Sequence, residues 1–329
     1  MRPSLGFTEF NPLTPGPTAD IVEASGPRRA PQGRRDDFYA TPIVDGKPAP
    51  NTPLTRLRDR LRALFVTAAE REEAQLETSL RRLPGVSRTN IVATLSPKGG
   101  CGKTTSTFLT GNVLASHLRL RVLAVDLNPD FGTLADLAPD RVRAPLSLVD
   151  LLRDKDAIGS PGELRPFVSR LPSGLHILAA PPDPAVMAQM TPELYGELLA
   201  FLRRFYEVIL LDLGTGVTAP IATFAVDRAD QVVVVTTPEW ITNTKVQTAL
   251  GHLGLERATL VLNKVDGAAG QKATERQFSR ERIAQRVAIP ADVQLKTMLD
   301  SGTFSLPGLR RSTRLPIKRL GLAVASQLA

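Results

Sequence analysis

With 329 residues, 42% of them hydrophobic but only 5% aromatic, the chain can bury one large core with appendages and hardly three domains. It has no apolar run near the roughly 18 residues of a membrane helix, and its first ten residues lack the basic and apolar regions of a signal peptide, so we expect a cytoplasmic protein. The single cysteine, Cys101, excludes an internal disulfide framework, and with only three scattered histidines a zinc site is not expected.

The first segment, residues 1–53, is rich in proline and glycine and poor in large apolar side chains. Such a composition cannot bury enough surface to offset the entropy lost on ordering, so we predict a disordered leader. Two roles stay open for it. It is either a flexible leader or a docking segment that orders on a partner.

The second segment, residues 54–86, predicts one long amphipathic helix that ends at Pro84-Gly85. Leucines from Leu54 to Leu83 recur at helical spacing among Arg and Glu. Its apolar stripe could pack on the following domain, form a dimeric coiled coil or bind a partner. The helix could also lie on anionic lipid, but its acidic residues Glu70, Glu72 and Glu73 argue against this.

From residue 87 to 329 strands and helices alternate, which predicts a doubly wound α/β domain with a mostly parallel sheet. Helical stretches such as Thr104–His117 and Pro192–Phe205 separate short apolar runs rich in β-branched residues, as expected of strands buried on both faces. The predicted strands are Asn90–Leu95, Val122–Val125, Leu175–Ala179, Val208–Leu211, Gln231–Val235 and Thr259–Leu262.

A glycine-rich loop follows the first of these strands and precedes a helix. Glycines let backbone N–H groups turn around phosphate oxygens, and the helix N-terminus adds a favourable partial charge. In such a loop Lys103 reaches the β- and γ-phosphates and the Thr104 hydroxyl ligates Mg²⁺. We therefore expect nucleotide contacts from Lys98, Gly99, Gly100, Cys101, Gly102, Lys103, Thr104 and Thr105.

The loop departs from the standard phosphate-loop spacing, because Pro97 stands at the first glycine position and a second lysine, Lys98, precedes the glycines. In this it resembles the deviant Walker A loop of the MinD/ParA family of P-loop ATPases. The resemblance spans about residues 89–329 and implies that Lys98 crosses a dimer interface to the partner's phosphates, so that ATP binding and homodimerisation are one event. Cys101 stands where the family commonly has valine, and we interpret it as a small apolar filler rather than a redox switch.

Further residues match the family's motifs. Glu207–Gly216 resembles the Walker B strand and the switch after it, which implies that Asp212 holds the Mg²⁺ shell through a water and that Gly214 and Gly216 approach the γ-phosphate. Asn263 resembles the family's adenine-reading asparagine. Pro290, with its neighbour Asp292, resembles the later loop that covers the base.

One switch departs from the family pattern. After the second strand the family has two aspartates one residue apart, of which the second orients the attacking water; here Asp126 holds the first position, as a predicted metal-site residue, and Asn128 the second. An amide can hydrogen-bond a water but cannot accept its proton. We expect slow hydrolysis; the alternatives are hydrolysis carried by Asp130 and ATP binding with little turnover.

The C-terminal region is basic, since residues 270–329 hold 11 Lys and Arg against 4 Asp and Glu in a chain of net charge +8. The cluster Arg310, Arg311, Arg314, Lys318 and Arg319 could contact DNA phosphates, or be a solvated surface, or pair with Glu70–Glu73. The last helix is small and alanine-rich, so we do not expect it to insert into a membrane.

The expected function is an ATP-dependent switch that positions or recruits a cargo, such as DNA, a cell-division apparatus or a secretion machine. The expected cofactors are ATP and Mg²⁺. The expected partner is a protein cargo or a protein that activates hydrolysis. The leader and the stretches Asp126–Leu134 and Thr236–Trp240 look most like actinobacterial MinD-like proteins, some of them associated with type VII secretion. The alternative is an ATP-binding scaffold with little hydrolysis that recruits partners through residues 1–85, and an iron–sulfur enzyme is excluded by the single thiol.

Overall fold

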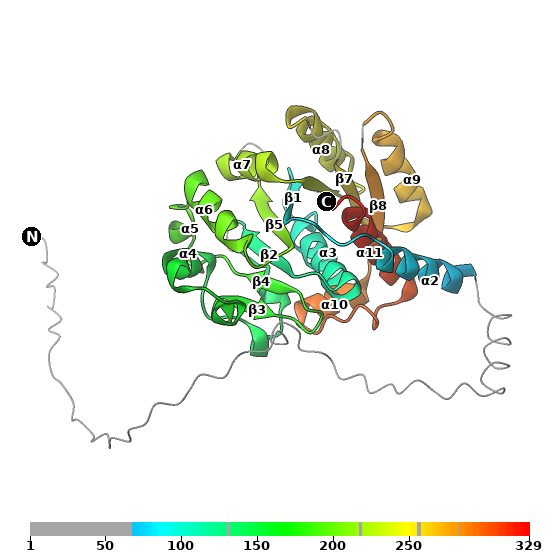
Figure 1. Ribbon diagram of the computed structural model, residues 1–329. Helices are drawn as coiled ribbons and strands as arrows, with labels where there is room; N and C mark the ends of the chain where they lie inside the picture. The colour runs from blue at the N-terminus through cyan, green and yellow to red at the C-terminus, as the bar shows by residue number, and fades with distance from the viewer. Residues whose placement is uncertain (1–67, 130–131, 217–218, 255–257, 282) are drawn as a thin grey trace, which may run out of the picture. The chain divides into compact units, whose positions relative to one another are not determined.

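The computed structural model describes residues 68–329 apart from 130–131, 217–218, 255–257 and 282 (Figure 1). The predicted leader at 1–53 and residues 54–67 of the predicted long helix lie outside this part of the chain. So does Asp130, one of the two residues proposed for orienting water. No helix in the described ranges is both long and apolar enough to cross a bilayer.

The described residues form an eight-stranded sheet in the order β3-β4-β2-β5-β1-β6-β7-β8. Every pairing is parallel except that of β3 with β4. The predicted mostly parallel sheet is therefore confirmed. The strands are β1 Asn90–Ser96, β2 Val122–Leu127, β3 Val168–Arg170, β4 His176–Leu178, β5 Val208–Thr215, β6 Gln231–Thr236, β7 Thr259–Val265 and β8 Gln285–Pro290.

Helices cover both faces of the sheet (Figure 1). The α-helices are α2 Ala68–Arg81, α3 Lys103–Leu118, α4 Leu148–Asp154, α5 Pro184–Met187, α6 Pro192–Leu202, α7 Pro220–Arg228, α8 Trp240–His252, α9 Gly267–Gln277, α10 Val293–Asp300 and α11 Arg311–Ala325. Short 3₁₀ turns are η2 Ala135–Leu137, η3 Asp140–Val142, η4 Lys155–Ala157 and η5 Pro161–Leu164.

Two hydrophobic cores lie on opposite faces of the sheet. In β1, Ile91, Ala93 and Leu95 belong to the core shared with α4, α6, α7 and α8, whereas Val92 belongs to the core shared with α3, α10 and α11. Successive side chains of a strand point to opposite faces, and burial on both faces explains why apolar residues stand next to one another in β1 rather than alternating with exposed polar ones.

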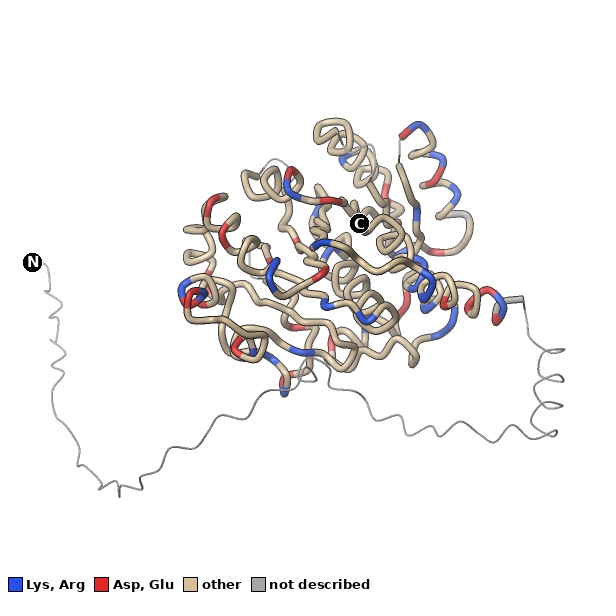
Figure 2. Tube along the Cα trace, viewed as in Figure 1, with Lys and Arg blue, Asp and Glu red and all other residues tan. Residues whose placement is uncertain are grey.

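The described part of the N-terminal helix, α2, packs against α3 and α11. Leu80 is fully buried there, in the core that also contains Ile317 and Leu320 of α11. Of the roles predicted for the apolar stripe, packing on the following domain is the one found for this part. The helix thereby brings its acidic residues close to the basic residues of α11 (Figure 2).

Glu73 is the centre of this contact. Its Oε1 accepts from Arg314 Nε at 2.7 Å and from Lys318 Nζ at 2.9 Å, and its Oε2 lies 3.4 Å from Arg311 Nε. Glu77 Oε1 accepts from Lys318 at 2.5 Å, and Glu72 pairs with Arg319. Four of the five residues of the basic cluster are thus ion-paired with α2, and their charge is largely compensated within the fold.

Candidate functional site

The glycine-rich loop lies at the carboxyl end of β1, in the middle of the sheet, and leads directly into α3. Gly100 and Gly102 adopt φ values of 75° and 93°, in the left-handed region that residues with a Cβ rarely occupy. A Cβ on Gly102 would also lie 2.1 Å from Asn263 Nδ2. Both glycines are required by the backbone path, which presents loop N–H groups at the N-terminus of a 16-residue helix.

Lys103 begins α3 and is 9% exposed. Burial holds the pKa of its ammonium below the usual value, although the nearby Asp212 carboxylate opposes that shift. No described residue hydrogen-bonds the ammonium. A cation held in this way attracts an anionic group that can enter the loop.

Asp212, on β5, is almost completely buried beside the loop. Thr107 Oγ1 donates to its Oδ1 at 3.3 Å, and Thr104 also hydrogen-bonds it. Its Oδ2 is buried and accepts no hydrogen bond from the residues that the structure describes. Burial, and secondly the charge of Asp126, raise the pKa of the Asp212 carboxyl to about 7.

Asp126 lies directly opposite Asp212 in the register of β2 and β5. Its Oδ1 accepts from the Asn128 N–H at 3.1 Å and its Oδ2 from the Leu134 N–H at 2.9 Å. Burial raises the pKa of this carboxyl to about 6, against the lowering effect of the two N–H donors. Asp126 therefore holds the backbone at Asn128 and at Leu134, whereas Asp212 Oδ2 has no hydrogen-bond partner among the described residues.

The segment that follows Asp126 packs closely on its own aspartate and on Gly214 of β5. A Cβ on Gly132 would lie 2.5 Å from Asp126 Oδ2, and a Cβ on Gly214 would lie 2.9 Å from Asn128 Oδ1 and 2.6 Å from Pro129 Cδ. Asn128 thus packs on the backbone that follows Asp212. Asn128 therefore lies beside β5, the strand that carries Asp212.

Two side chains of β7 donate hydrogen bonds to backbone carbonyls of the loop. Asn263 Nδ2 donates to the Cys101 carbonyl at 2.8 Å, and Lys264 Nζ donates to the Gly100 carbonyl at 2.8 Å. Lys264 adopts φ 57°, which is uncommon for a residue with a Cβ. Cys101 is 1% exposed, in keeping with a filler. Asn263 was expected near the base, and in this structure its amide holds the loop.

Lys98, in the same loop, forms an ion pair with Glu239, the residue that precedes α8. Both side chains are largely exposed. Beside this ion pair lies a pocket of about 400 Å³, which is lined by Lys98, Gly99, Gly100, Cys101, Thr237, Pro238, Glu239, Lys264 and Asp266. The hydroxyl of Thr237, in this lining, is buried without a hydrogen-bond partner among the described residues.

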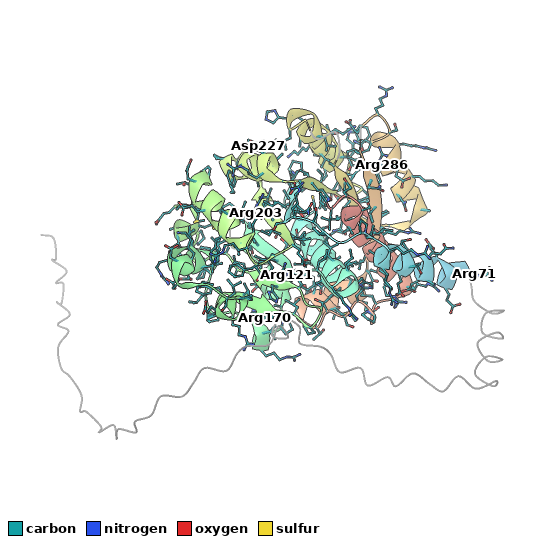
Figure 3. All side chains as sticks on the ribbon, in the orientation of Figure 1. Arg71, Arg121, Arg170, Arg203, Asp227 and Arg286 are labelled. Atoms are coloured by element: carbon teal, nitrogen blue, oxygen red, sulfur yellow. The ribbon has the colours of Figure 1, made fainter. Side chains whose placement is uncertain are left out.

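Pro290 does not line this pocket. It ends β8, opposite Val265, and lines a second pocket of about 260 Å³ together with Arg286 of the same strand (Figure 3). Asp292 caps α10 by accepting from the Gln294 and Leu295 N–H groups at 2.7 and 3.2 Å. The structure thus brings together the loop, Asp126, Asn128, Asp212 and Asn263, and leaves Pro290 at the adjacent strand end.

The donor set suits Mg²⁺ bound with a nucleotide. Magnesium keeps several waters and takes one or two protein oxygens beside phosphate oxygens. Asp212 Oδ2 and the Thr104 hydroxyl are such oxygens. In the described ranges no group of three or more His, Cys, Asp or Glu side chains could hold a metal by itself.

Residues 92–305, more than half of the chain, match the family model described as the CobQ/CobB/MinD/ParA nucleotide-binding domain. The chain belongs to this family. The predicted resemblance to MinD and ParA is thereby confirmed. Members of the MinD/ParA group are P-loop ATPases that dimerise and position a cargo.

Solved structures with this fold include a ParA family ATPase from Chlorobium tepidum, with a TM-score of 0.61 and 22% identity over 71% of this chain and 98% of that one. MinD from Pyrococcus horikoshii, complexed with Mg-ADP, has a TM-score of 0.56 and 23% identity over 71% and 94% of the two chains. A third is a putative plasmid partition protein from Borrelia burgdorferi bound to AMPPNP, with a TM-score of 0.55 and 14% identity over 71% and 98%. At these identities the likeness establishes the fold.

Among curated proteins, the chain is 30% identical over 172 residues to the ESX-1 secretion-associated protein EspI of Mycobacterium tuberculosis. The aligned part is 52% of this chain and 25% of EspI. The chain therefore spans about a quarter of the length of the curated relative that it matches.

Sequence reasoning missed several residues that the fold brings to the site. They are Glu239 beside Lys98, Lys264 on the Gly100 carbonyl, Thr107 on Asp212, and Thr237 in the pocket wall. A usable signal was present, because Thr237, Glu239 and Lys264 follow or end predicted strands at the carboxyl edge where ligands bind in α/β sheets. Their partners, however, are distant in sequence.

Proposed function

We propose that the protein is a cytoplasmic, ATP-dependent switch whose two copies associate when ATP and Mg²⁺ are bound and separate after slow hydrolysis to ADP and phosphate. The observation that supports it best is Asp212 Oδ2, a buried and unpartnered carboxylate oxygen beside the phosphate loop. A buried anionic oxygen without a partner is costly, and a Mg²⁺ shell would satisfy it. The Lys103 ammonium, likewise buried, would meet the phosphates.

In this proposal Lys103 binds the β- and γ-phosphates, and the Thr104 hydroxyl and the Asp212 carboxylate hold Mg²⁺, Asp212 through a water. The metal would neutralise charge on the phosphate oxygens during transfer. Asp126 keeps the 128–134 loop against this centre through the Asn128 and Leu134 N–H groups. Asn263 and Pro290 would contact the adenine after the loop has closed on the nucleotide.

Lys98 would act in trans, on the phosphates bound by the second copy. Its ammonium is exposed and, among the described residues, pairs with Glu239 alone, so it can leave that ion pair at small cost, since exposed pairs contribute little to stability. Light scattering with ADP, with ATP and without nucleotide tests this role. Wild type should dimerise with ATP, Lys98→Ala should not, and Lys296→Ala, which removes an exposed lysine of α10, should behave as wild type. An oligomeric state that ignores nucleotide in all three proteins would contradict the switch.

Slow turnover follows from Asn128. An amide in contact with Gly214 can orient a water but cannot take its proton, and phosphoryl transfer depends mainly on positioning and charge stabilisation. We expect Asn128→Asp to raise the single-turnover rate. If Asp130→Ala lowers the rate instead, Asp130 carries the step. Rates unchanged in both variants would show that the switch has been assigned to the wrong segment.

The cargo that the relatives favour is a secretion machine. EspI carries the description ESX-1 secretion-associated, and its aligned region covers half of this chain. DNA is a less favoured cargo, because four of the five basic residues of the C-terminal cluster are ion-paired with α2. Absence of ATP-dependent DNA binding at low salt would remove the DNA hypothesis.

The second candidate function is an ATP-binding scaffold with little hydrolysis that recruits partners through residues 1–85. Asn128 is the observation that favours it. Multiple-turnover measurement separates the two functions: a switch releases phosphate repeatedly, alone or with an activating partner, whereas a scaffold retains ATP. In either case nucleotide binding itself is expected.

A further inference from the structure

Strand β8 lies at one edge of the sheet (Figure 1). β7 pairs one side of it, and no other strand among the described residues pairs the second side. The Ala284 N–H donates to the Ala258 carbonyl at 3.1 Å, and the backbone groups of successive residues in a strand alternate in direction. The N–H and C=O groups of Gln285, Val287 and Ile289 therefore point away from β7, to the open edge.

The second pocket, of about 260 Å³, lies at this edge. Its lining includes Gln271 of α9, Val287 and Ala288 of β8, and Ser312 and Arg319 of α11. Val287 belongs to the core shared with α11, whereas Ala288 packs against the core on the opposite face, so the pocket borders β8 from both faces. A space that reaches both faces of an edge strand extends past its unpaired side, where an extended peptide can pair with the strand.

The charges in the second pocket favour an acidic peptide. Arg286 and Arg319 line it, and none of the described residues that line it is acidic. The Arg286 guanidinium donates to the carbonyls of Phe278 and Glu281 at 3.1 and 3.2 Å, and these neutral acceptors hold it in place without neutralising its charge (Figure 3). Arg319 pairs with Glu72, and half of its side chain is exposed. Carboxylates beside a peptide on β8 would therefore meet guanidinium groups.

The chain itself enters α2 beside this pocket. α2 begins at Ala68, and Glu72 in its second turn is the residue that pairs with Arg319. Residues 1–67 therefore lead up to the pocket. A linker of residues 45–67 spans up to roughly 75 Å when extended, at about 3.3 Å per residue, so its length allows the residues before it to reach β8.

One run before this linker has the composition of an added strand. Residues 38–44 read Phe-Tyr-Ala-Thr-Pro-Ile-Val, and aromatic and β-branched residues favour strands. Aspartates flank the run on both sides, two before it and one after it. Pro42 has no N–H, and an added strand tolerates it where its backbone faces away from β8. With that orientation the backbone groups of Tyr39, Thr41 and Ile43 face β8.

We propose that residues 38–44 add one further strand to the sheet by pairing with the open edge of β8, with the flanking carboxylates near Arg286 and Arg319. The added strand ties the leader to the strand next to β7, which supports the phosphate loop. The pairing requires neither nucleotide nor a second copy of the chain. It is therefore independent of the switch proposed above.

Hydrogen exchange of the full-length protein without nucleotide tests the pairing. Backbone hydrogen bonds protect N–H groups from exchange. An added strand slows exchange at the outward groups of Gln285, Val287 and Ile289. The N–H groups of Arg286 and Ala288, which point to β7, serve as the internal reference for the stability of the sheet.

Thr41→Pro is the test variant, since it removes an N–H that faces β8. We expect exchange at the outward groups of β8 to become at least roughly tenfold faster, and exchange at the reference groups to be unchanged. Ala40→Pro is the matched control, because it removes an N–H that faces away from β8, and exchange should stay slow. A synthetic peptide of residues 36–45 added to Thr41→Pro should restore slow exchange, whereas the same peptide with the Thr41→Pro change should not.

Three outcomes would overturn the proposal. Equal exchange in wild type, Thr41→Pro and Ala40→Pro would show that the run does not cover β8. The leader has one other acidic run with β-branched residues, Asp-Ile-Val-Glu at 20–23, and faster exchange in Ile21→Pro but not in Thr41→Pro would assign the edge to that run. Slow exchange that is lost on dilution would assign it to a second copy. A protein whose mass ignores nucleotide would contradict the switch and leave this pairing unaffected.

Discussion

At the scale of single residues, the site is organised by two buried carboxylates with different surroundings. Asp126 uses both oxygens to hold backbone N–H groups, whereas Asp212 keeps Oδ2 unpartnered. Burial raises the pKa of both carboxyls, to about 6 and about 7. A carboxyl whose pKa is raised on folding retains its proton longer in the folded chain, so it lowers stability as pH rises from about 4 to about 7.

The first prediction concerns Asp212→Asn. Without nucleotide, the variant should be at least as stable as wild type at pH 8, because the buried charge is gone, and its advantage should shrink as pH falls towards 5. Mg²⁺-dependent nucleotide affinity should fall roughly 10–100-fold, the effect typical of losing a carboxylate that orients metal-bound water. Thermal unfolding against pH and nucleotide titration with and without Mg²⁺ measure the two effects.

Asp227→Asn is the control for this change, since Asp227 is an exposed aspartate of α7 (Figure 3). It should alter neither the pH profile nor the Mg²⁺ dependence. An Asp212→Asn protein with the affinity of wild type in Mg²⁺ would remove Asp212 from the metal site.

The second prediction concerns Gly214→Ala. The added Cβ meets Pro129 Cδ and Asn128 Oδ1 at 2.6 and 2.9 Å, so one of the two switch segments must shift. We expect a loss of about 1–3 kcal/mol in the free energy of unfolding without nucleotide. Gly251→Ala, at a helical position with open space around it, should be neutral or stabilising by up to about 1 kcal/mol. Equal stability of the two variants would mean that the segments do not pack as described.

At the scale of elements, α2 is held on α11 by charge as well as by apolar packing. Glu73 receives hydrogen bonds from Arg314 and Lys318, which together with their charges lower the pKa of its carboxyl from 4.5 to about 2, against the effect of burial. A carboxyl whose pKa is lowered on folding stabilises the fold above its unfolded pKa, and that stabilisation is lost as pH falls through the folded value. The contribution of Glu73 should therefore disappear between pH 4.5 and about 2.

The third prediction is that Glu73→Gln destabilises the protein at pH 7 by about 1–3 kcal/mol, the range for hydrogen bonds to charged groups that are partly buried. Removing the anion also leaves Lys318, whose side chain is 5% exposed, with Glu77 as its remaining ion-pair partner in the described part of the chain. Denaturant unfolding at pH 7 and pH 3 should show the difference between variant and wild type shrinking at the lower pH.

Asp300→Asn is a suitable reference for this series, because Asp300 is an exposed acid at the end of α10. Its difference from wild type should be small at both pH values. A Glu73→Gln difference that stays constant from pH 7 to pH 3 would assign the loss to packing rather than to the ion pairs.

At the scale of the described domain, the phosphate loop joins β1 and α3, and β7 supports the loop through Asn263 and Lys264. Nucleotide binding is therefore expected to stabilise the folded chain as a whole. Ligand at 100 times its Kd contributes about 2.7 kcal/mol, which corresponds to a rise of several °C in Tm for a domain of this size.

The fourth prediction follows from this linkage. Mg²⁺ with ATP should raise the Tm of wild type, and Lys103→Ala should abolish the rise, because the buried ammonium is the main charge available to the phosphates. Lys296→Ala, which removes an exposed lysine of α10, should keep the rise. A Lys103→Ala protein stabilised as much as wild type would contradict the phosphate-binding role of the loop.

Much of the fold was predictable because it depends on local patterns. The six predicted strands correspond to β1, β2, β4, β5, β6 and β7, all of them central enough to be apolar on both faces. The two missed strands are those at the edges of the sheet. β3 has three residues, and β8 begins with two exposed ones, so neither gives the uninterrupted apolar run of a central strand.

By itself, the sequence determined the phosphate loop, the strand ends that carry Asp126, Asp212 and Asn263, and the replacement at Asn128, because these depend on residue type and on periods of a few residues. Only the tertiary structure decided which distant groups meet. Lys98 and Glu239 are 141 residues apart, Gly100 and Lys264 are 164 apart, and Glu73 and Arg314 are 241 apart. Local periodicity contains no information about such pairs; strand order and helix packing bring them together.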